Sequence, residues 1–466
     1  MELWMFWWSL VMEFRPAFSR YRTFLWFGVV LSAMCIRMDH RFVTCMPRAL
    51  GLPPCCYERF LGFFHSSAVQ LELLTKLWTN LAMRIAKHKL LRVNGRIVLL
   101  ADGIKVAKSG RKMPAVKKLH QESQNNSKPE YIYGHSCQAI ALVIQAASTF
   151  FALPLCSRIH EGLVFSNRDK RTLLDKLVAL FLSLDIQQSC YLVADAYYAS
   201  SKIIRPLIAC GHHLIAAVRK NAVAYENPTT SYSGRGRPRK YGAKIQLRDL
   251  FNDTTQFIAA PSPVYGETKT DILYRTVDLL WRPVGITVRF VLVSHPSRGK
   301  VIFLCSDLTL QPIEIIRLYG IRFKIEVSFK QAIHTIGTYC YHFWMAAMNP
   351  IPRRSGDQYL HRKSEPYRRQ VRRKFAAYHC HIQVGIIAQG VLQLIAVIHP
   401  EAVWKSFASW LRTKRPGIPP SEWVVSIALR NAFPYFLADA DPELPLTKFL
   451  HENMDPEMAV PLRLIA

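Results

Sequence analysis

Two apolar segments of this chain each end in an aspartate, and this pattern restricts the fold more than any other feature. Asp102 closes the apolar run in VLLADGIKV, and Asp195 closes the run in YLVADAYYAS. A carboxylate at the end of a buried strand is costly to desolvate unless it is paired or binds a cation. A third acidic residue, Glu326, lies in RLYGIRFKIEVSFK, a segment with helical spacing. We interpret these three carboxylates as ligands of a divalent metal site.

The charge of the chain favours a polyanionic partner. Lys and Arg together number 61 against 32 Asp and Glu, so the formal net charge is +29. At this length such an excess predicts binding to nucleic acid. A membrane surface is the rival explanation, but the apolar run at 24–36 is shorter than the roughly 20 residues of a spanning helix. We expect no membrane association, and eleven scattered cysteines without a CxxC pair favour a reducing compartment.

The order of the predicted elements indicates an α/β fold. Strands are expected at 96–107, 132–146, 149–159, 190–195 and 213–219, and helices at 168–184 and 200–210. Three strands that meander, followed by strand and helix in alternation, are typical of an RNase H-like mixed sheet with helices. In that fold the first and fourth strands are neighbours. Asp102 and Asp195 would then lie side by side despite their separation in sequence.

The remaining segments surround and interrupt this core. Residues 1–92 read as helical, and one helix is expected to begin at Ser66 or Ser67 with an apolar stripe through Trp78. The first part of the core covers 93–223, and an inserted β subdomain is expected over 224–310. The core then resumes over 311–345 with the helix of Glu326. A basic segment and a helical C-terminal region make up 346–466.

Four polar residues share one face of the helix expected at about 312–335, namely Tyr319, Arg322, Glu326 and Lys330. At about 100° per residue they lie within an arc of about 80°. A salt-bridged surface helix would produce the same pattern. The two strand-ending aspartates and the positive charge of the chain favour a functional face instead.

The three carboxylates suit phosphoryl transfer on nucleic acid. That chemistry uses two metal ions roughly 3.5–4 Å apart, one to activate the attacking oxygen and one to stabilise the leaving oxygen. Mg²⁺ takes oxygen ligands and keeps waters, so two or three carboxylates suffice where the substrate phosphate supplies the rest. We expect Asp102, Asp195 and Glu326 to hold two Mg²⁺ ions, with Mn²⁺ able to substitute.

Over residues 95–340 the chain resembles the DDE transposases of bacterial insertion sequences, in particular those with a β-rich insertion between the second Asp and the Glu. Tyr319-x2-Arg322-x3-Glu326 matches the Y-x2-R-x3-E signature of that family. Asp102 and Asp195 match its two aspartate motifs in local sequence, order and spacing. The family usually has a Lys seven residues after the Glu, where this chain has Ile333. We expect Lys330, one turn earlier, to take the place of that Lys in holding DNA.

This resemblance implies a transposase that binds the terminal inverted repeats of its element through residues 1–92. It would cleave there by metal-assisted attack of water and join the freed 3′ hydroxyl to target DNA. Glu326 would be a metal ligand, while Tyr319 and Arg322 would contact phosphates. The implied partner is double-stranded DNA, both transposon ends and target, bound by a homodimer. The implied location is the bacterial cytoplasm, in association with the nucleoid.

Two other interpretations stay open. One is a DNA-binding descendant of a transposase with a silent catalytic site, which Ile333 favours. The other is an RNase H-like nuclease without strand transfer. Terminal inverted repeats around the reading frame would favour the transposase over both.

A short basic string, Arg235-Gly-Arg237-Pro-Arg239, lies inside the expected insertion. It resembles the core of an AT-hook, in which an extended Gly-Arg-Pro segment lies in the narrow minor groove of DNA. We expect Arg235, Arg237 and Arg239 to contact DNA. A charged loop without minor-groove binding is the alternative.

Several other conspicuous residues are expected to be structural. Nine Lys or Arg within 351–374 form a loop or a solvated helix start. Trp281 reads as a core residue on a strand, and Asp307 as a turn or helix-start residue. The sequence from His379 to His381 does not have the spacing of a usual zinc site.

Two substitutions distinguish a minor-groove hook from a charged loop. Arg237→Lys keeps the charge but loses the planar guanidinium, and Pro238→Ala keeps every charge but relaxes the extended backbone. For a hook, both changes weaken binding to A·T-rich duplex more than to G·C-rich duplex, as measured by fluorescence anisotropy. If the wild type and both variants bind the two duplexes equally well, the hook is excluded and the loop remains.

Overall fold

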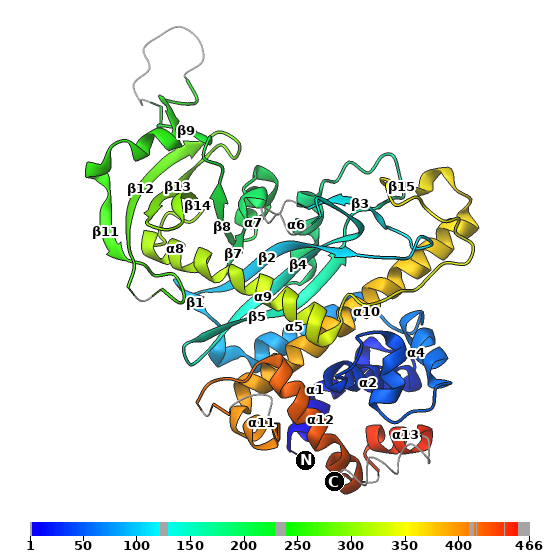
Figure 1. Ribbon diagram of the computed structural model, residues 1–466. Coiled ribbons are helices and arrows are strands. Elements are labelled where there is room, and N and C mark those ends of the chain that lie inside the picture. The colour runs from blue at the N-terminus through cyan, green and yellow to red at the C-terminus, as the bar shows by residue number, and fades with distance from the viewer. Residues whose placement is uncertain are drawn as a thin grey trace.

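The computed structural model describes residues 2–121, 129–228, 239–267, 269–409, 414–415, 417–441 and 443–454. Figure 1 shows a large twisted sheet above a body of helices, in which the N-terminal helices lie beside those near the C-terminus. The helices are α1 (Glu2–Met12), α2 (Tyr21–Ile36), α3 (Met46–Ala49), α4 (Cys56–Phe64), α5 (Leu71–Ile85), α6 (Leu173–Ser183), α7 (Ser201–Ala209), α8 (Pro312–Ile321), α9 (Phe323–Gln331), α10 (Glu365–Ile398), α11 (Pro400–Ser406), α12 (Glu422–Asp439) and α13 (Pro445–Asn453). The strands are β1 (Arg92–Val93), β2 (Arg96–Ala107), β3 (Lys117–His120), β4 (Tyr131–Ala146), β5 (Thr149–Ile159), β6 (Leu163–Val164), β7 (Cys190–Ala194), β8 (His213–Val218), β9 (Val223–Tyr225), β10 (Lys244–Gln246), β11 (Ile258–Pro261), β12 (Asp271–Trp281), β13 (Ile286–His295), β14 (Gly299–Cys305) and β15 (Gln358–Tyr359).

Five strands in the order β5-β4-β2-β7-β8 form the centre of the sheet. β4 runs antiparallel to both β2 and β5, whereas β7 runs parallel to β2 and β8 runs parallel to β7. A three-strand meander followed by two parallel strands reached through helices is the RNase H-like arrangement. The predicted fold class is therefore confirmed, including the adjacency of the first and fourth strands.

Local sequence signals explain most element boundaries. β2 covers the predicted 96–107. Asn94 and Gly95 have φ values of 48° and 72°, which suit the tight two-residue turn between β1 and β2. The predicted start of α5 at Ser66 or Ser67 is wrong, because the helix begins at Leu71 and its N-cap residue, Gln70, makes no side-chain capping bond. The apolar stripe of that helix is buried as expected, with Trp78 fully enclosed.

The strands within 224–310, the segment expected to be an insertion, extend the core sheet. β14 pairs antiparallel with β8, and β13 and β12 follow in order. These strands and those of the core therefore belong to one sheet of 13 strands, while β6 and β15 of the described residues form a separate two-stranded sheet. β14 closes the far edge of the core at Ile302 to Cys305, opposite the buried residues of β8.

The two faces of the central strands belong to different cores. Ile97 and Leu99 of β2 pack in the core that includes α6 and α7, while Val98 and Leu100 pack in the core under α8. This alternation follows from the two-residue period of a strand. α9 continues across the second face after a join at Arg322, where α8 ends and α9 begins.

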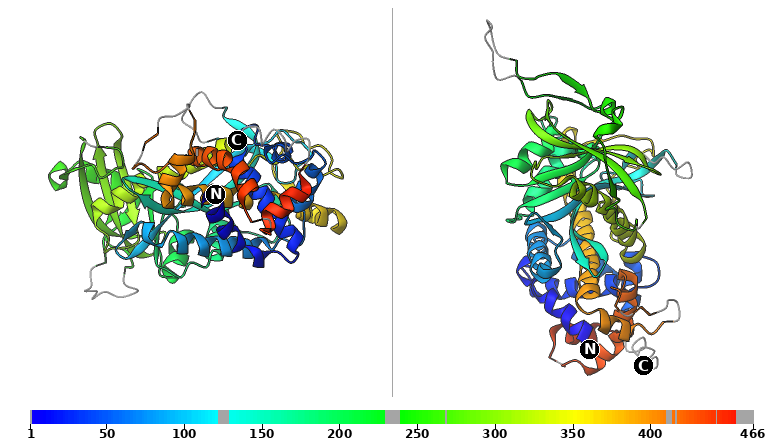
Figure 2. Two further views of the ribbon diagram at one scale, coloured as in Figure 1. Left: turned by 90° about the horizontal axis from the view of Figure 1, so that it is seen from below. Right: turned by 90° about the vertical axis from the view of Figure 1, so that its left-hand side faces the viewer.

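The long helix α10 runs between the sheet and the helical body (Figure 2). An 18-residue window of this helix is apolar enough and long enough to cross a membrane, yet 94% of it is buried inside the protein. Such burial is typical of a core helix. A close contact fixes its position: a Cβ added at Gly390 would lie 2.1 Å from Cζ2 of Trp78, whose indole donates to the Pro154 carbonyl at 2.9 Å.

This contact predicts opposite effects for two helical glycines. Gly390→Ala should lower the free energy of unfolding by about 1–3 kcal/mol, because the new methyl group must displace Trp78 from β5. Gly62→Ala in α4 meets nothing within 4 Å and should raise the stability by up to about 1 kcal/mol through helix propensity. Urea unfolding midpoints measured by circular dichroism test both. Equal midpoints for the two variants would contradict the packing described for α5 and α10.

Candidate active site

Strand alternation brings Asp102 and Asp195 to the same face of the sheet. β2 and β7 pair in parallel with Leu100 opposite Val193. Both of those residues face the core under α8, and each aspartate lies two residues further along its strand direction. Because side chains two residues apart share a face, the carboxylates come to neighbouring positions under the helix pair α8 and α9.

The helix α9 adds the third carboxylate. Ile325 is buried in the core of this sheet face, which fixes the helix against the strands. Arg322 and Glu326 lie one turn apart beside it. Arg322 Nη1 donates to Asp102 Oδ2 at 2.8 Å, and Nη2 donates to Glu326 Oε1 at 3.0 Å. One guanidinium thus links the central strand to the helix.

All three carboxylates line one cleft of about 660 Å³. Backbone amides orient two of them: Gly103 N–H donates to Asp102 Oδ1 at 2.7 Å, and Tyr197 N–H donates to Asp195 Oδ1 at 2.9 Å. The structure therefore brings together the residues that the sequence nominated as metal ligands, from two strand positions and a crossing helix.

The electrostatics of the cleft show a shortage of positive charge next to Asp102. The pKa of the Asp102 carboxyl is raised to about 6, chiefly by burial; the Arg322 guanidinium opposes this rise, and the nearby Asp195 and Glu326 contribute to it. The Arg322 guanidinium pairs with two carboxylates, those of Asp102 and Glu326. A divalent cation would relieve that imbalance.

The donor set suits Mg²⁺, which prefers carboxylate oxygens and substrate phosphates as ligands. The present arrangement is not a closed metal site, however, because no three His, Cys, Asp or Glu side chains of the described residues are grouped to hold an ion. The Arg322 guanidinium takes one oxygen each of Asp102 and Glu326.

Three of the six residues predicted to contact DNA, Tyr319, Arg322 and Lys330, lie on the same helix pair. The Tyr319 ring packs 4.5 Å from the Phe303 ring, and the Arg322 guanidinium carbon lies 5.7 Å from the Tyr319 ring centre. Burial raises the pKa of the Tyr319 phenol. Lys330 is exposed at the end of α9.

Ile333 lies where the helix changes its winding. It belongs to a π-helical turn, Ala332–Ile336, and is half-buried against the main core. Arg239 is exposed. Arg235 and Arg237 lie outside the described residues, so the hook hypothesis stays a prediction.

Trp281, Asp307 and the histidines of α10 have the structural surroundings expected of them. Trp281 is buried. Asp307 accepts from the Tyr191 hydroxyl at 2.7 Å and pairs with Arg96 at 3.1 Å. His379 and His381 belong to α10, where burial drives the pKa of both imidazoles well below its usual range.

Sequence reasoning missed the basic wall of the cleft. Lys105 of β2 and Lys117, Lys118 and His120 of β3 line it together with the carboxylates. β3 is too short to be recognised from its own pattern.

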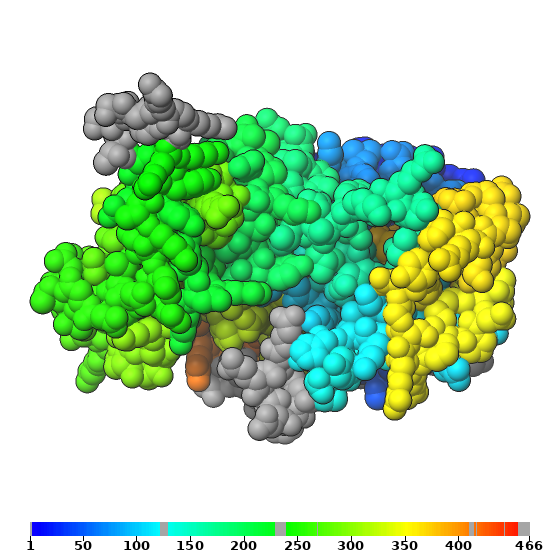
Figure 3. Space-filling model, turned by 90° about the horizontal axis from the view of Figure 1, so that it is seen from above, coloured from blue at the N-terminus to red at the C-terminus, as the bar shows by residue number. Residues whose placement is uncertain are grey.

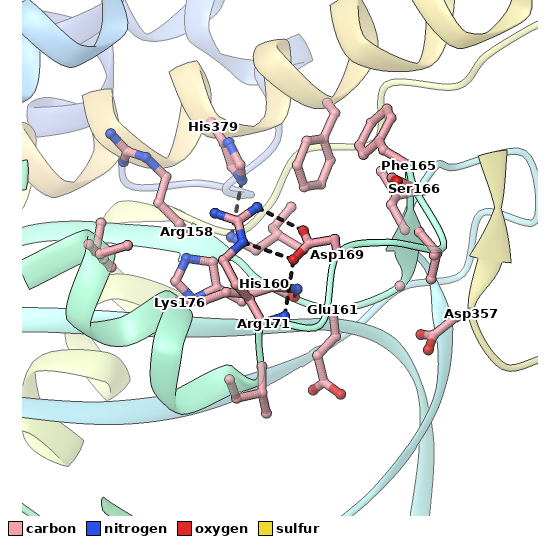
Figure 4. A pocket seen from close by; sticks show the side chains of 18 of the residues that line it. Arg158, His160, Glu161, Phe165, Ser166, Asp169, Arg171, Lys176, Asp357 and His379 are labelled. Carbon is pink, nitrogen blue, oxygen red and sulfur yellow. Dashed lines mark hydrogen bonds and ion pairs between the residues drawn. The ribbon is translucent and has the colours of Figure 1, made fainter. Parts of the chain in front are cut away.

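A second cavity of about 610 Å³ adjoins the cleft and shares Glu161 and Leu173 with it. Its charged groups have protein partners. Figure 4 shows Arg171 paired with Asp169, and Arg171 Nη2 lies 2.8 Å from Asp169 Oδ2. Arg158 donates to Gln383 at 2.8 Å. These contacts give the cavity a structural character.

The strand order and the three carboxylates define an RNase H-like nuclease core. The chain belongs to the DDE superfamily endonucleases, whose family model matches residues 13–262, more than half of the chain, and includes Asp102 and Asp195. No curated protein matches the chain. Among solved structures, the chain is similar to the cryo-EM structure of a piggyBac transposase synaptic complex with hairpin DNA. The identity is 12% and the TM-score 0.38, over 92% of this chain and 74% of that one, which is too distant to support an argument about function.

Proposed function

We propose that this protein is the transposase of a bacterial insertion sequence. It binds the terminal inverted repeats of its element, cleaves the DNA there and transfers the freed 3′ ends to target DNA. The observation that carries the proposal is the convergence of Asp102, Asp195 and Glu326 on one cleft of an RNase H-like sheet. Membership of the DDE superfamily endonucleases supports the cleavage chemistry.

The three carboxylates would hold two Mg²⁺ ions, with Mn²⁺ able to substitute. When bound, such ions activate the attacking oxygen and stabilise the leaving oxygen of the phosphodiester. Arg322, Tyr319 and Lys330 lie on the helix pair beside the cleft, where they can take DNA phosphates. The basic wall formed by Lys105, Lys117 and Lys118 adds phosphate contacts from the other side.

A second positive surface supports a duplex partner. We call it the basic ridge, which consists of the exposed cations Arg353, Arg354, Arg362, Lys363, Arg369 and Arg373. The ridge adjoins the cleft wall, since Lys118 N–H donates to the Ser355 carbonyl and Lys117 Nζ lies 2.8 Å from Asp357 Oδ1. Figure 3 shows this segment in yellow beside the cyan region that contains β3. Cleft and ridge together suit a duplex longer than the cleft itself.

Coordinated cutting of two transposon ends requires two active sites, so we propose that the protein acts as a homodimer on DNA. Its place of action would be the nucleoid in the bacterial cytoplasm. The silent DNA-binding descendant remains the second candidate, because Ile333 replaces the lysine of the signature and is half-buried.

Loss of any one carboxylate should abolish cleavage but not DNA binding. Asp102→Ala, Asp195→Ala and Glu326→Ala should each lower the rate of Mg²⁺-dependent cleavage by at least ~10³-fold, since each removes a ligand but leaves the basic surfaces intact. The substrate is a duplex that carries the repeats found beside the reading frame. Gel-based cleavage and anisotropy measure the two properties.

Glu314→Ala is the matched control, because Glu314 pairs with Arg317 on α8 and does not line the cleft. It should cleave like the wild type. A triad variant with near-normal cleavage would remove that residue from the site. A wild type that binds the repeats and cuts nothing would identify the silent descendant.

The basic ridge should contribute to the salt dependence of duplex binding. Each phosphate neutralised adds about −0.9 to the slope of log K against log salt, so Arg362→Gln combined with Lys363→Gln should make the slope shallower by about 2. The control pair, Lys405→Gln with Arg430→Gln, removes two exposed cations from the helical body. A slope that changes equally in both double variants would show that only net charge matters.

A further inference from the structure

Arg322 forms ion pairs with two of the three carboxylates, Asp102 on the central strand and Glu326 on the helix. Its guanidinium bonds to Asp102 and to Glu326 at 2.8 and 3.0 Å. The pair is largely shielded, with side-chain exposures of 18% for Arg322 and 15% for Asp102. At such burial a charge–charge contact is much stronger than at the surface.

Each oxygen of Asp102 already accepts one hydrogen bond. Its Oδ1 accepts from the Gly103 amide at 2.7 Å, and its Oδ2 accepts from Arg322. A metal ion bound to Asp102 Oδ2 would have to displace the guanidinium, and one bound to Oδ1 would be repelled by the nearby positive charge. The site is therefore occupied by an internal cation in this conformation.

The guanidinium itself is incompletely satisfied. Arg322 Nε is buried and has no hydrogen-bond partner. A phosphate diester offers a planar fork donor two acceptor oxygens, and guanidinium–phosphate pairs are among the strongest charge-assisted contacts. Arg322 lies at the join of α8 and α9, and its guanidinium contacts Asp102 and Glu326, two residues that line the cleft.

We propose that Arg322 is an internal counter-ion that excludes metal from the carboxylates until a DNA phosphate takes its guanidinium, so that metal loading follows DNA binding. This inference rests on the proposed function. The carboxylates then face the cleft with two unpaired oxygens at the moment when substrate is present. By linkage, DNA tightens metal binding and metal tightens DNA binding by the same factor. Arg322 is in this respect a positioning residue.

Manganese binding tests the proposal without any measurement of cleavage. The electron paramagnetic resonance signal of free Mn²⁺ gives the affinity of the full-length protein, alone and with a linear duplex that carries the flanking repeats. The wild type alone should bind Mn²⁺ weakly and gain about tenfold or more with duplex. Arg322→Gln alone should already show about that higher affinity and gain little from duplex.

Two further variants keep the result interpretable. Arg317→Gln removes the same charge from α8, where the arginine bonds only to Glu314 among the described residues at 2.6 and 2.9 Å, and it should behave like the wild type. Arg322→Lys keeps a cation but cannot form the fork that bridges both carboxylates. It should give an intermediate Mn²⁺ affinity in the absence of DNA.

Three outcomes would overturn the proposal. If the wild type and Arg322→Gln bind Mn²⁺ equally well without DNA, or if Arg317→Gln gains as much Mn²⁺ affinity as Arg322→Gln, then Arg322 does not exclude metal. Either result would leave the proposed metal site itself intact. If no variant binds Mn²⁺ even with duplex, the metal-dependent function fails as well. Circular dichroism of each variant confirms that the comparison is made on folded protein.

Discussion

The parallel pairing of β2 with β7 is the interaction on which the site depends. Because Leu100 lies opposite Val193, the register sets both aspartates at one level of the sheet and on one face. A shift by one residue would send one of them into the opposite core. The apolar residues before each aspartate secure this register, since they are fully enclosed on both faces. The position of the two half-buried carboxylates is thus imposed by the enclosed apolar residues that precede them.

The sequence predicted those parts of the fold whose signals are local. Apolar runs bounded by turn residues defined β2, β4 and β5 to within a residue or so, and the strand order then followed from the α/β pattern. The pairing of β14 with β8 could not be foreseen, because it joins segments about 85 residues apart whose patterns fit many partners equally well. The start of α5 was misjudged because Ser66 accepts a bond from Ala68 in the preceding turn rather than from the helix.

The sequence identified most residues of the candidate site, but it did not show how these residues pair with one another. Spacing on a helix shows that Arg322 and Glu326 are neighbours, yet nothing local indicates that the same arginine reaches Asp102 across the sheet. The helix that carries Glu326 is also held at its far end by the N-terminal region. Arg37 donates to the Ile336 carbonyl at 2.5 Å and Arg41 to the His334 carbonyl at 3.0 Å, which places cations at the carbonyl end of the π-helical turn.

The continuity of the sheet gives the inserted strands a protective role. β14 covers the edge of β8, a strand whose Leu214 to Val218 are buried. Without this cover β8 would present unpaired amides and carbonyls next to apolar side chains, which is the usual template for edge-to-edge aggregation. These strands are therefore not a removable accessory. A shortened relative that dispensed with them would need another strand, helix or subunit to close the same edge.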